Sequence, residues 1–119
     1  KLIAALRSYR LSSQAQFRQI TTKGKFIRAS VLSMRWIESP DGVCRFCFIA
    51  KKKNGNAVYR NRCRRVLRPF FFQWASLSEK PIWAMISVNV KSSEMNSEVL
   101  RSSGERLLEK LEGRLHDSL

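Results

Sequence analysis

Residues 51–68 read KKKNGNAVYRNRCRRVLR, and this stretch is the most informative part of the chain. It contains eight basic residues and no acidic residue. Gly55 and Asn56 separate a lysine cluster from an arginine-rich segment, and both residue types favour turns. From Ala57 onward the apolar residues follow one helical stripe, formed by Tyr59, Cys63, Val66, Leu67 and Phe70. The stretch therefore predicts a lysine-rich turn and then an amphipathic helix that begins at Ala57.

The polar side of this predicted helix is almost entirely basic. Its members are Arg60, Asn61, Arg62, Arg64, Arg65 and Arg68. Like charges three or four residues apart on a helix repel by roughly a few tenths of a kcal/mol per pair, and a bound anion would relieve that repulsion. The alternative is a solvated helix face, but such faces usually mix Glu with Lys. Pro69 lacks an N–H and disfavours helical geometry at Arg68, so we expect it to end or kink the helix.

Length and charge indicate one domain that spans residues 1–119 and binds a polyanion. The chain has 119 residues and a formal net charge of +14. Residues 1–68 hold 17 of the 23 basic residues and two acids, whereas residues 69–119 hold six basic and seven acidic residues. We therefore interpret residues 1–68 as the functional half, which binds the polyanion, and residues 69–119 as the half that completes the fold. A phosphate backbone is the natural partner of such a surface.

Cysteine usage and hydropathy indicate a cytoplasmic protein. No apolar run approaches the roughly 18–20 residues of a transmembrane helix, and residues 2–6 lack a signal-peptide cleavage pattern. The three cysteines are an odd number, which favours reduced thiols. Cys44, Cys47 and Cys63 with His116 could in principle hold zinc, but Cys47 and Cys63 lie in apolar patterns that are typical of small core residues. We therefore expect no metal site.

The remaining pattern predicts an α+β fold, a two-layer sandwich in which helices pack on a small four-stranded sheet. In chain order we expect a helix at 14–23, strands at 31–37 and 43–50, the basic helix, a strand at 82–90 and a helix at 97–115. Ser12 and Ser13 would cap the first helix, which Gly24 would end. The turn at 39–42 would join its two flanking strands as a hairpin. A further strand at 25–29 gives the order α-β-β-(β)-α-β-α.

With these elements in place, the chain resembles the protein component of bacterial ribonuclease P. That family has a lysine pair at a strand end, a Gly-Asn-Ala-Val turn and an R-N-R-x-K-R-x-x-R helix. The matching residues here are Lys52, Lys53, Gly55, Asn56, Ala57, Val58, Arg60, Asn61, Arg62, Arg65 and Arg68, with Arg64 in the usual lysine position. The segment RLSSQAQFRQITTKGKFI at 10–27 is also similar to the opening helix of the family.

The resemblance implies the small subunit of a ribonucleoprotein endonuclease that removes the 5′ leader from precursor tRNA. The RNA subunit would perform the hydrolysis with Mg²⁺ held mainly by that RNA and the substrate, so no catalytic residue is expected in the protein. The partners would be the ribonuclease P RNA and precursor tRNA, with no membrane and no protein partner. The implied RNA-binding residues are Lys51, Lys52, Lys53, Asn56, Arg60, Asn61, Arg62, Arg64, Arg65 and Arg68.

A cleft beside the first helix would bind the single-stranded leader, with Phe17, Arg18 and Trp36 as its candidate residues. Phe17 could equally be a core residue of that helix. The chain departs from the family pattern at Thr21 and Ser33, where the family has aromatic residues, and at Pro69, where an acid is common. We expect these departures to affect the leader cleft more than the docking of the RNA subunit.

Two functions of other classes compete with this interpretation. A structural RNA-binding protein, similar to a small ribosomal protein, would bind RNA without any role in tRNA cleavage. A DNA-binding domain could place the basic helix in a major groove. However, arginines around three sides of a helix suit backbone neutralisation better than base readout, which uses a few residues on one face.

Overall fold

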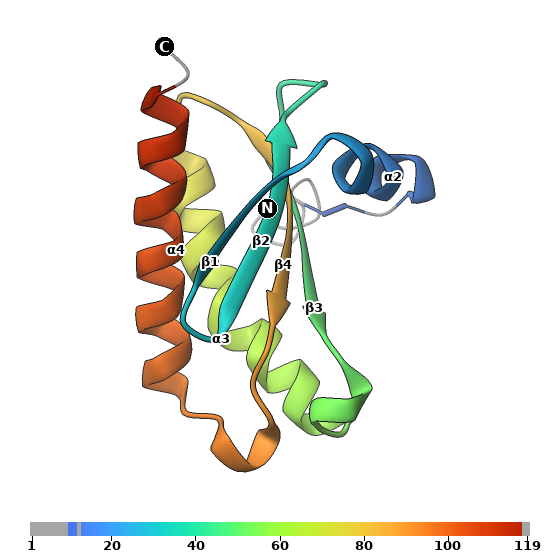
Figure 1. Cartoon of the computed structure of the whole chain (residues 1–119), viewed down its shortest axis with the longest axis vertical. Helices are drawn as coiled ribbons and strands as arrows, with labels where there is room; N and C mark the ends of the chain where they lie inside the picture. Colours follow the sequence, from blue (N-terminus) through green and yellow to red (C-terminus); the bar gives the residue numbers. More distant parts are fainter. Residues whose placement is uncertain (1–9, 12, 118–119) are drawn as a thin grey trace.

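The computed structural model describes residues 10–11 and 13–117, in which three α-helices pack on a four-stranded sheet (Figure 1). The elements are α2 (Gln14–Lys23), β1 (Lys25–Ala29), β2 (Leu32–Glu38), β3 (Arg45–Ala50), η1 (Lys52–Asn54), α3 (Ala57–Leu77), β4 (Ile82–Val88), η2 (Ser92–Glu94) and α4 (Ser97–Asp117). The predicted α+β class and element order are confirmed, including the additional strand β1. Most predicted boundaries agree within two residues, which is the usual uncertainty of an element end.

The predicted hairpin between β2 and β3 is wrong, because β4 lies between these two strands. The strand order is β1-β2-β4-β3. β4 runs antiparallel to β2 and parallel to β3. Since parallel strands need a long crossover, the connection from β3 to β4 contains the whole of α3. The turn after Glu38 therefore reverses the chain but leaves room for a central strand that arrives later.

The hairpin that does form joins β1 and β2. Ala29 pairs with Leu32, so Ser30 and Val31 make a two-residue loop. Ser30 has a φ of 53°, which is the left-handed conformation that such tight hairpin loops require. β1 is consequently one edge of the sheet, and β3 is the other edge.

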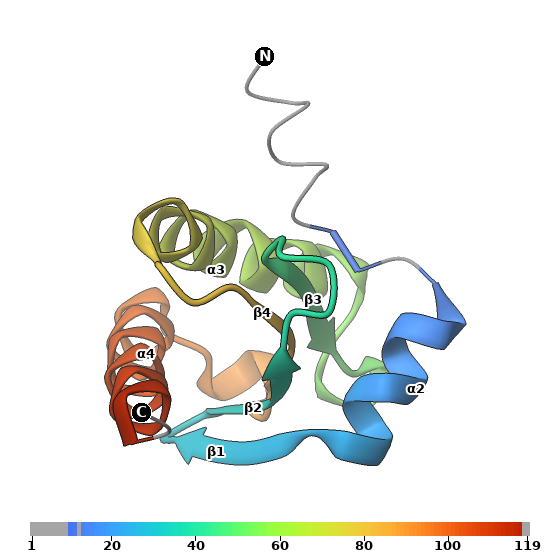
Figure 2. The same ribbon diagram turned by 90° about the horizontal axis from the view of Figure 1, so that it is seen from above.

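Helices cover both faces of the sheet, as Figure 2 shows. The larger core lies between the sheet and helices α3 and α4, and its strand residues include Met34, Trp36, Phe46 and Ile86. A smaller cluster lies on the other face, under α2. Strand residues alternate between the two faces. Because helices cover each face, both sides of the central strand β4 are buried. The sheet thus has α2 on one face and the α3–α4 pair on the other. Helices therefore cover both faces, whereas the sequence pattern predicted a two-layer sandwich.

Helix α3 continues past Pro69 to Leu77, so the predicted end of the helix at Pro69 is wrong, and the alternative of a kink there stays a prediction. The residues after the proline are apolar: Phe71 is fully buried, and Phe70 and Phe72 pack against the main core. Phe71 also contacts the rings of Phe46 and Phe48 edge-on. This packing offsets the interior hydrogen bond that a proline removes.

The first helix begins and ends where the sequence predicts. Ser13 forms a capping box with Gln16, in which each side chain bonds the other residue's backbone N–H. Ser12, the other predicted cap, lies outside the described residues. Gly24 ends α2 with an extended backbone, and its N–H donates to the Ile20 carbonyl at 2.8 Å. A Cβ at Gly24 would collide with that carbonyl and with the Arg35 side chain, so close approach explains the glycine.

The thiols lie in apolar surroundings on both faces of the sheet. Cys44 and Cys63 belong to the main core, whereas Cys47 packs in the cluster under α2. His116 is exposed and pairs with Glu112 at 3.4 Å. Within residues 10–11 and 13–117 no three His, Cys, Asp or Glu residues gather closely enough to hold a metal ion. None of the described helices has the length and apolar character needed to cross a bilayer.

Candidate nucleic-acid interface

The basic helix starts at a well-formed cap that follows the lysine cluster. Lys51, Lys52 and Lys53 are exposed on and beside η1. The Asn56 side chain accepts the backbone N–H of Tyr59 at 3.0 Å and thereby caps α3. This bond occupies the Asn56 side-chain oxygen with the helix itself. The asparagine predicted to bind RNA therefore has a definite structural role at the N-terminus of α3.

The buried stripe of α3 orients its basic side toward solvent. Tyr59, Cys63, Leu67 and Phe71 are buried and follow each other at intervals of four residues. The Tyr59 hydroxyl donates to the Val90 carbonyl, which ties the first turn of α3 to the chain after β4. Gly55 has an extended backbone, and a Cβ there would collide with the Tyr59 ring. The glycine is therefore needed for this close approach and not for a positive φ.

The predicted RNA-binding residues differ in exposure. Besides Lys51, five cationic side chains and one amide are exposed. They are Lys52, Lys53, Asn61, Arg62, Arg65 and Arg68. Arg60 and Arg64 are half-buried. The Arg60 Nε donates a hydrogen bond to the Asn56 carbonyl oxygen at 3.4 Å. The Arg64 guanidinium donates one to the Asn61 amide oxygen at 3.5 Å. Arg62, Arg65 and Arg68 form a cationic face on α3, which has no acidic residue along its length, and Lys52 and Lys53 precede this face on η1.

The outer edge of β3 receives two hydrogen bonds from outside the sheet. The Leu11 N–H donates to the Phe46 carbonyl at 3.1 Å. The Arg64 Nε donates to the Phe48 carbonyl at 3.2 Å. Phe46 and Phe48 are two residues apart, so their carbonyls point to the same side of the strand. The edge strand is therefore covered by the segment before α2 and by one arginine of α3, which reduces its tendency to pair with another chain.

Arg10 lies near the arginines of α3, although it is far from them in the sequence. It forms a bridge with Phe46 on β3. Partial burial lowers the pKa of Arg68, and the positive charges of Arg64 and Arg10 lower it further. Burial raises the pKa of the Cys47 thiol, while the same two arginines act in the opposite direction. These effects place Arg64 and Arg10 near both Arg68 and Cys47. Sequence reasoning missed Arg10, because only its charge, and no motif, marks it.

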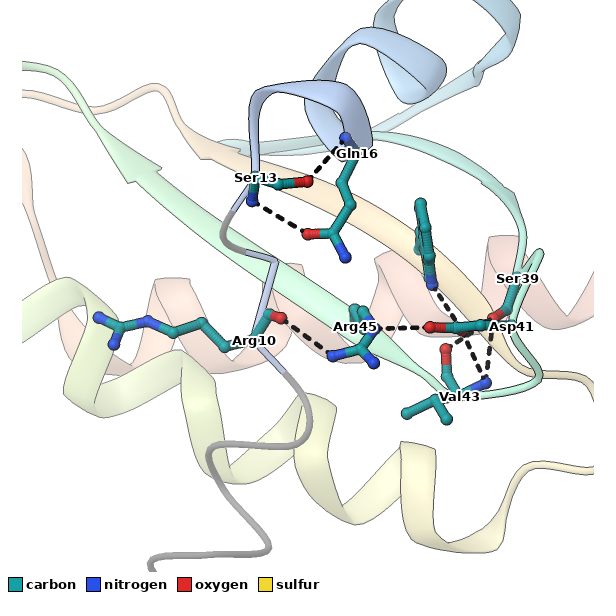
Figure 3. A network of polar contacts seen from close by, with 8 residues as sticks. Arg10, Ser13, Gln16, Ser39, Asp41, Val43 and Arg45 are labelled. Atoms are coloured by element: carbon teal, nitrogen blue, oxygen red, sulfur yellow. Dashed lines mark hydrogen bonds and ion pairs between the residues drawn. The ribbon is translucent and has the colours of Figure 1, made fainter.

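A polar network fixes the segment that carries Arg10 (Figure 3). The Arg45 guanidinium donates to the Arg10 carbonyl at 3.4 Å and to the Asp41 carboxylate at 2.9 Å. Asp41 also accepts from the Ser39 hydroxyl and from the Trp83 indole, at 2.8 and 3.1 Å. Its slight burial would raise its pKa, but these hydrogen bonds outweigh that effect and hold the pKa well below its usual range. The carboxylate is therefore charged and anchors the cluster.

The three predicted leader-binding residues have different environments. Phe17 is half-buried and packs against the cluster under α2, so its ring is part of a core. Arg18 is exposed. Trp36 is only 1% exposed and belongs to the main core, on the face of the sheet opposite α2. Its ring is not accessible to a strand that lies along α2. The structure thus removes Trp36 from the predicted leader surface.

Two of the departures from the family pattern are also explained locally. Ser33 is 8% exposed and its hydroxyl accepts the Asn89 side-chain amide at 3.1 Å. The pair links β2 to the residue just after β4. Thr21 is exposed, and its hydroxyl donates to the Arg18 carbonyl at 3.1 Å. Neither position offers an aromatic surface, so Phe17 is left as the aromatic candidate among the residues named for this surface.

Comparison with known proteins supports a relationship along most of the chain. The model of the family described as Ribonuclease P matches residues 6–112. The ribonuclease P protein component of Syntrophomonas wolfei is 37% identical over 59 residues, which are 50% of this chain and 50% of that protein. The component from Gluconacetobacter diazotrophicus is 36% identical over 63 residues, 52% and 54% of the two chains. The alignments thus span about half the length of the curated relatives.

Solved structures show the same fold at lower sequence identity. The RNase P protein of Staphylococcus aureus superposes with a TM-score of 0.77 at 22% identity, covering 87% of this chain and 94% of that one. The protein from Thermotoga maritima, solved with 1-(4-fluorophenyl)-2-thiourea, gives a TM-score of 0.71 at 22% identity and covers 83% and 96% of the two chains. These likenesses confirm the open mixed sheet and its helices as a known arrangement.

Proposed function

The chain belongs to the ribonuclease P family, and on this premise we propose that it is the protein subunit of a ribonucleoprotein that removes the 5′ leader from precursor tRNA. The observation that carries the proposal is the cationic face of α3, together with the lysines of η1 that precede it. Its exposed residues contain no carboxylate. Such a face suits the phosphate backbone of a large RNA, because each neutralised phosphate releases counterions.

The protein would dock the RNA subunit and contribute no nucleophile of its own. Arg62, Arg65 and Arg68 would contact phosphates, since they are exposed and have no carboxylate partner among the described ion pairs. Arg64 would hold α3 in place through the Phe48 carbonyl. The hydrolysis is assigned to the RNA subunit. The side chains of the protein then serve to bind and to orient RNA.

Magnesium would be held by the RNA subunit and the substrate. The described residues of this chain do not fit a magnesium site, which needs oxygen ligands gathered around one point. No such group of acidic residues occurs within residues 10–11 and 13–117, and the cationic face would repel a divalent ion. We therefore assign no step of the reaction to a metal bound by the protein.

The leader would pass along α2, where Phe17 and Arg18 supply an aromatic edge and a cation. Phe17 is only half-buried, so part of its ring can contact a base while the rest packs on the sheet. Stacking on aromatic side chains is the usual way in which proteins bind unpaired bases. Arg10, which pairs with Phe46 at the edge of β3, and Arg68 near it would supply further positive charge.

Precursor-tRNA cleavage by a bacterial ribonuclease P RNA tests the proposal. At low Mg²⁺ concentration, the protein should stimulate cleavage at the mature 5′ end. An Arg65→Ala variant should stimulate less at limiting protein, whereas Arg101→Ala, which removes an exposed arginine from α4, should act like the parent chain. Tight binding of the RNA without any stimulation would instead support a structural RNA-binding protein that has no role in tRNA cleavage.

A further inference from the structure

A shallow cavity lies between the C-terminal half of α4 and the edge strand β1, away from the basic face of α3. Its volume is about 480 Å³. The lining residues are Phe26, Ile27, Arg28, Lys110, Gly113 and Arg114. Half of these residues are cationic and none is acidic. We call this feature the α4–β1 cavity.

The cations that α4 contributes to this cavity lie on a different face of the helix from Glu112. Lys110 and Arg114 are four residues apart and therefore share one face of the helix. Glu112 is directed toward α3, where it accepts the Trp74 indole N–H at 2.6 Å. Glu112 also pairs with His116 on its own helix. The positive side chains thus meet β1 while this carboxylate is engaged elsewhere.

One contact between α4 and β1 fixes the cavity wall. The Lys110 ammonium donates to the Arg28 carbonyl. That carbonyl therefore points away from β2, toward the open edge of the sheet. Arg28 and Arg114 are exposed. The ion pairs found among the described residues join Arg45 to Asp41 and His116 to Glu112, so they leave the three cations of the cavity without a carboxylate partner.

Phe26 adds an exposed aromatic ring to these charges. It is 53% exposed, an unusual value for a phenylalanine in a strand. The Arg35 guanidinium lies 5.7 Å from its ring centroid and holds the ring in position. A preordered aromatic ring beside several cations matches an unpaired nucleotide, whose base stacks while its phosphates meet the charges. A duplex offers no free base face to such a ring.

The cavity is at the opposite edge of the sheet from the interface already described. The strand order places β1 and β3 at the two edges, and three strand spacings separate them by about 14 Å. The C-terminal end of α4 and the N-terminal end of α3 also lie at opposite ends of the molecule (Figure 1). A ligand in this cavity would therefore be bound independently of α3.

From these contacts we infer that the α4–β1 cavity is a second RNA-binding site, which takes a short single-stranded segment. One base stacks on Phe26, and the adjacent phosphates contact Arg28, Lys110 and Arg114. The inference goes beyond the proposed function, because it requires neither the catalytic RNA nor cleavage. It also gives residues 69–119 a role in binding. Their charge balance had indicated only that they complete the fold.

Nuclear magnetic resonance of the ¹⁵N-labelled full chain tests this inference with a six-nucleotide oligouridylate. The Gly113 amide lies in the cavity wall and reports on this site alone. We expect the amides of Gly113 and Phe26 to shift on titration, with an affinity that falls as salt rises. Shifts confined to α2 and α3 would overturn the inference, and this result would not affect the cleavage test.

Variants assign the roles within the site, each read from the Gly113 titration. Phe26→Ala should weaken binding by about fivefold or more, since a stacked base is lost. Arg114→Ala should lower the salt slope by about 0.7, the value for one single-strand phosphate contact. Arg101→Ala is the matched control, because it removes an exposed arginine of α4 that does not line the cavity. Equal effects of Arg101→Ala and Arg114→Ala would contradict a localised site.

Inorganic phosphate separates an RNA site from a site for free anions. We expect phosphate to shift the Gly113 amide far more weakly than the oligonucleotide at equal concentration. If phosphate binds as tightly as the oligonucleotide, and Phe26→Ala changes neither titration, then the cavity takes a free anion and the RNA assignment is wrong.

Discussion

Arg64 and Phe48 join the basic helix to the edge of the sheet: the arginine Nε donates to the phenylalanine carbonyl at 3.2 Å. The bond covers part of the exposed edge of β3 and fixes one side of α3 against it. Arg65, the next residue, is exposed. Two neighbouring arginines of one motif therefore have different tasks, since one positions the helix and the other is free to meet RNA.

Replacement of these two arginines should separate stability from binding. Arg64→Ala removes the bond to Phe48 and should lower the free energy of unfolding by about 1 kcal/mol, the usual contribution of one hydrogen bond. Arg65→Ala should leave that free energy within about 0.5 kcal/mol, as surface substitutions do. It should lower the salt slope of RNA binding by about one unit. Urea unfolding and binding at several salt concentrations measure both quantities. Equal destabilisation by the two variants would contradict this division.

Phe17 allows a test of the proposed leader surface. Phe17→Ala should weaken binding of precursor tRNA more than binding of mature tRNA, because only the precursor has a 5′ leader to stack. Because the ring also packs under α2, the variant should lose stability as well, so affinities must be compared below its unfolding temperature. Ile20→Val is the control, since Ile20 is fully buried in the same cluster and cannot touch RNA. Equal losses for precursor and mature tRNA would restrict Phe17 to a core role.

Pro69 lies inside α3 and removes one of its backbone hydrogen bonds. Pro69→Ala should therefore stabilise the protein, by up to about 3 kcal/mol on the scale of helix interiors. Residue 69 is exposed, so the alanine meets no steric obstacle from the core. Thermal unfolding measures the gain, and RNA affinity should not change. A loss of stability would mean that the helix needs the proline for its course around the core.

Asp41 predicts a pH dependence of stability. Its pKa is lowered in the folded state by its hydrogen bonds, so the folded form binds a proton less readily than the unfolded form does. The stabilisation is therefore present above the ordinary carboxyl pKa of about 4 and is lost as the pH falls below it. Asp41→Asn should destabilise the protein at pH 7, and the difference from the parent chain should shrink toward pH 3.

The control for this experiment is Glu38→Gln, which changes an exposed carboxylate at the end of β2. This variant removes a nearby carboxylate that takes no part in the hydrogen bonds of Asp41. Urea unfolding at pH 7, 5 and 3 gives both comparisons. A difference between Asp41→Asn and the parent chain that does not vary with pH would show that the network holds Asp41 by geometry and not by charge.

Local features of the chain were predicted well because their causes are local. The stripe that contains Tyr59, Cys63 and Leu67 predicted which side of α3 is buried, since helical spacing alone aligns these residues. Ile82, Ala84, Ile86 and Val88 alternate along β4 and form its core face, which likewise follows from the spacing of a strand. The Ser13 cap and the end of α2 at Gly24 also follow from neighbouring residues.

Only the tertiary structure decided which strands pair and which side chains meet. The turn after Glu38 gave no sign that β4 would separate β2 from β3, because pairing depends on which faces can be buried together. The same placement put Trp36 in the main core, and it brought Arg10 beside Arg64 and Arg68. Sequence spacing therefore determined the cationic helix itself. Long-range packing determined where that helix lies, which cations join it, and how Lys110 and Arg28 come together at the opposite edge of the sheet.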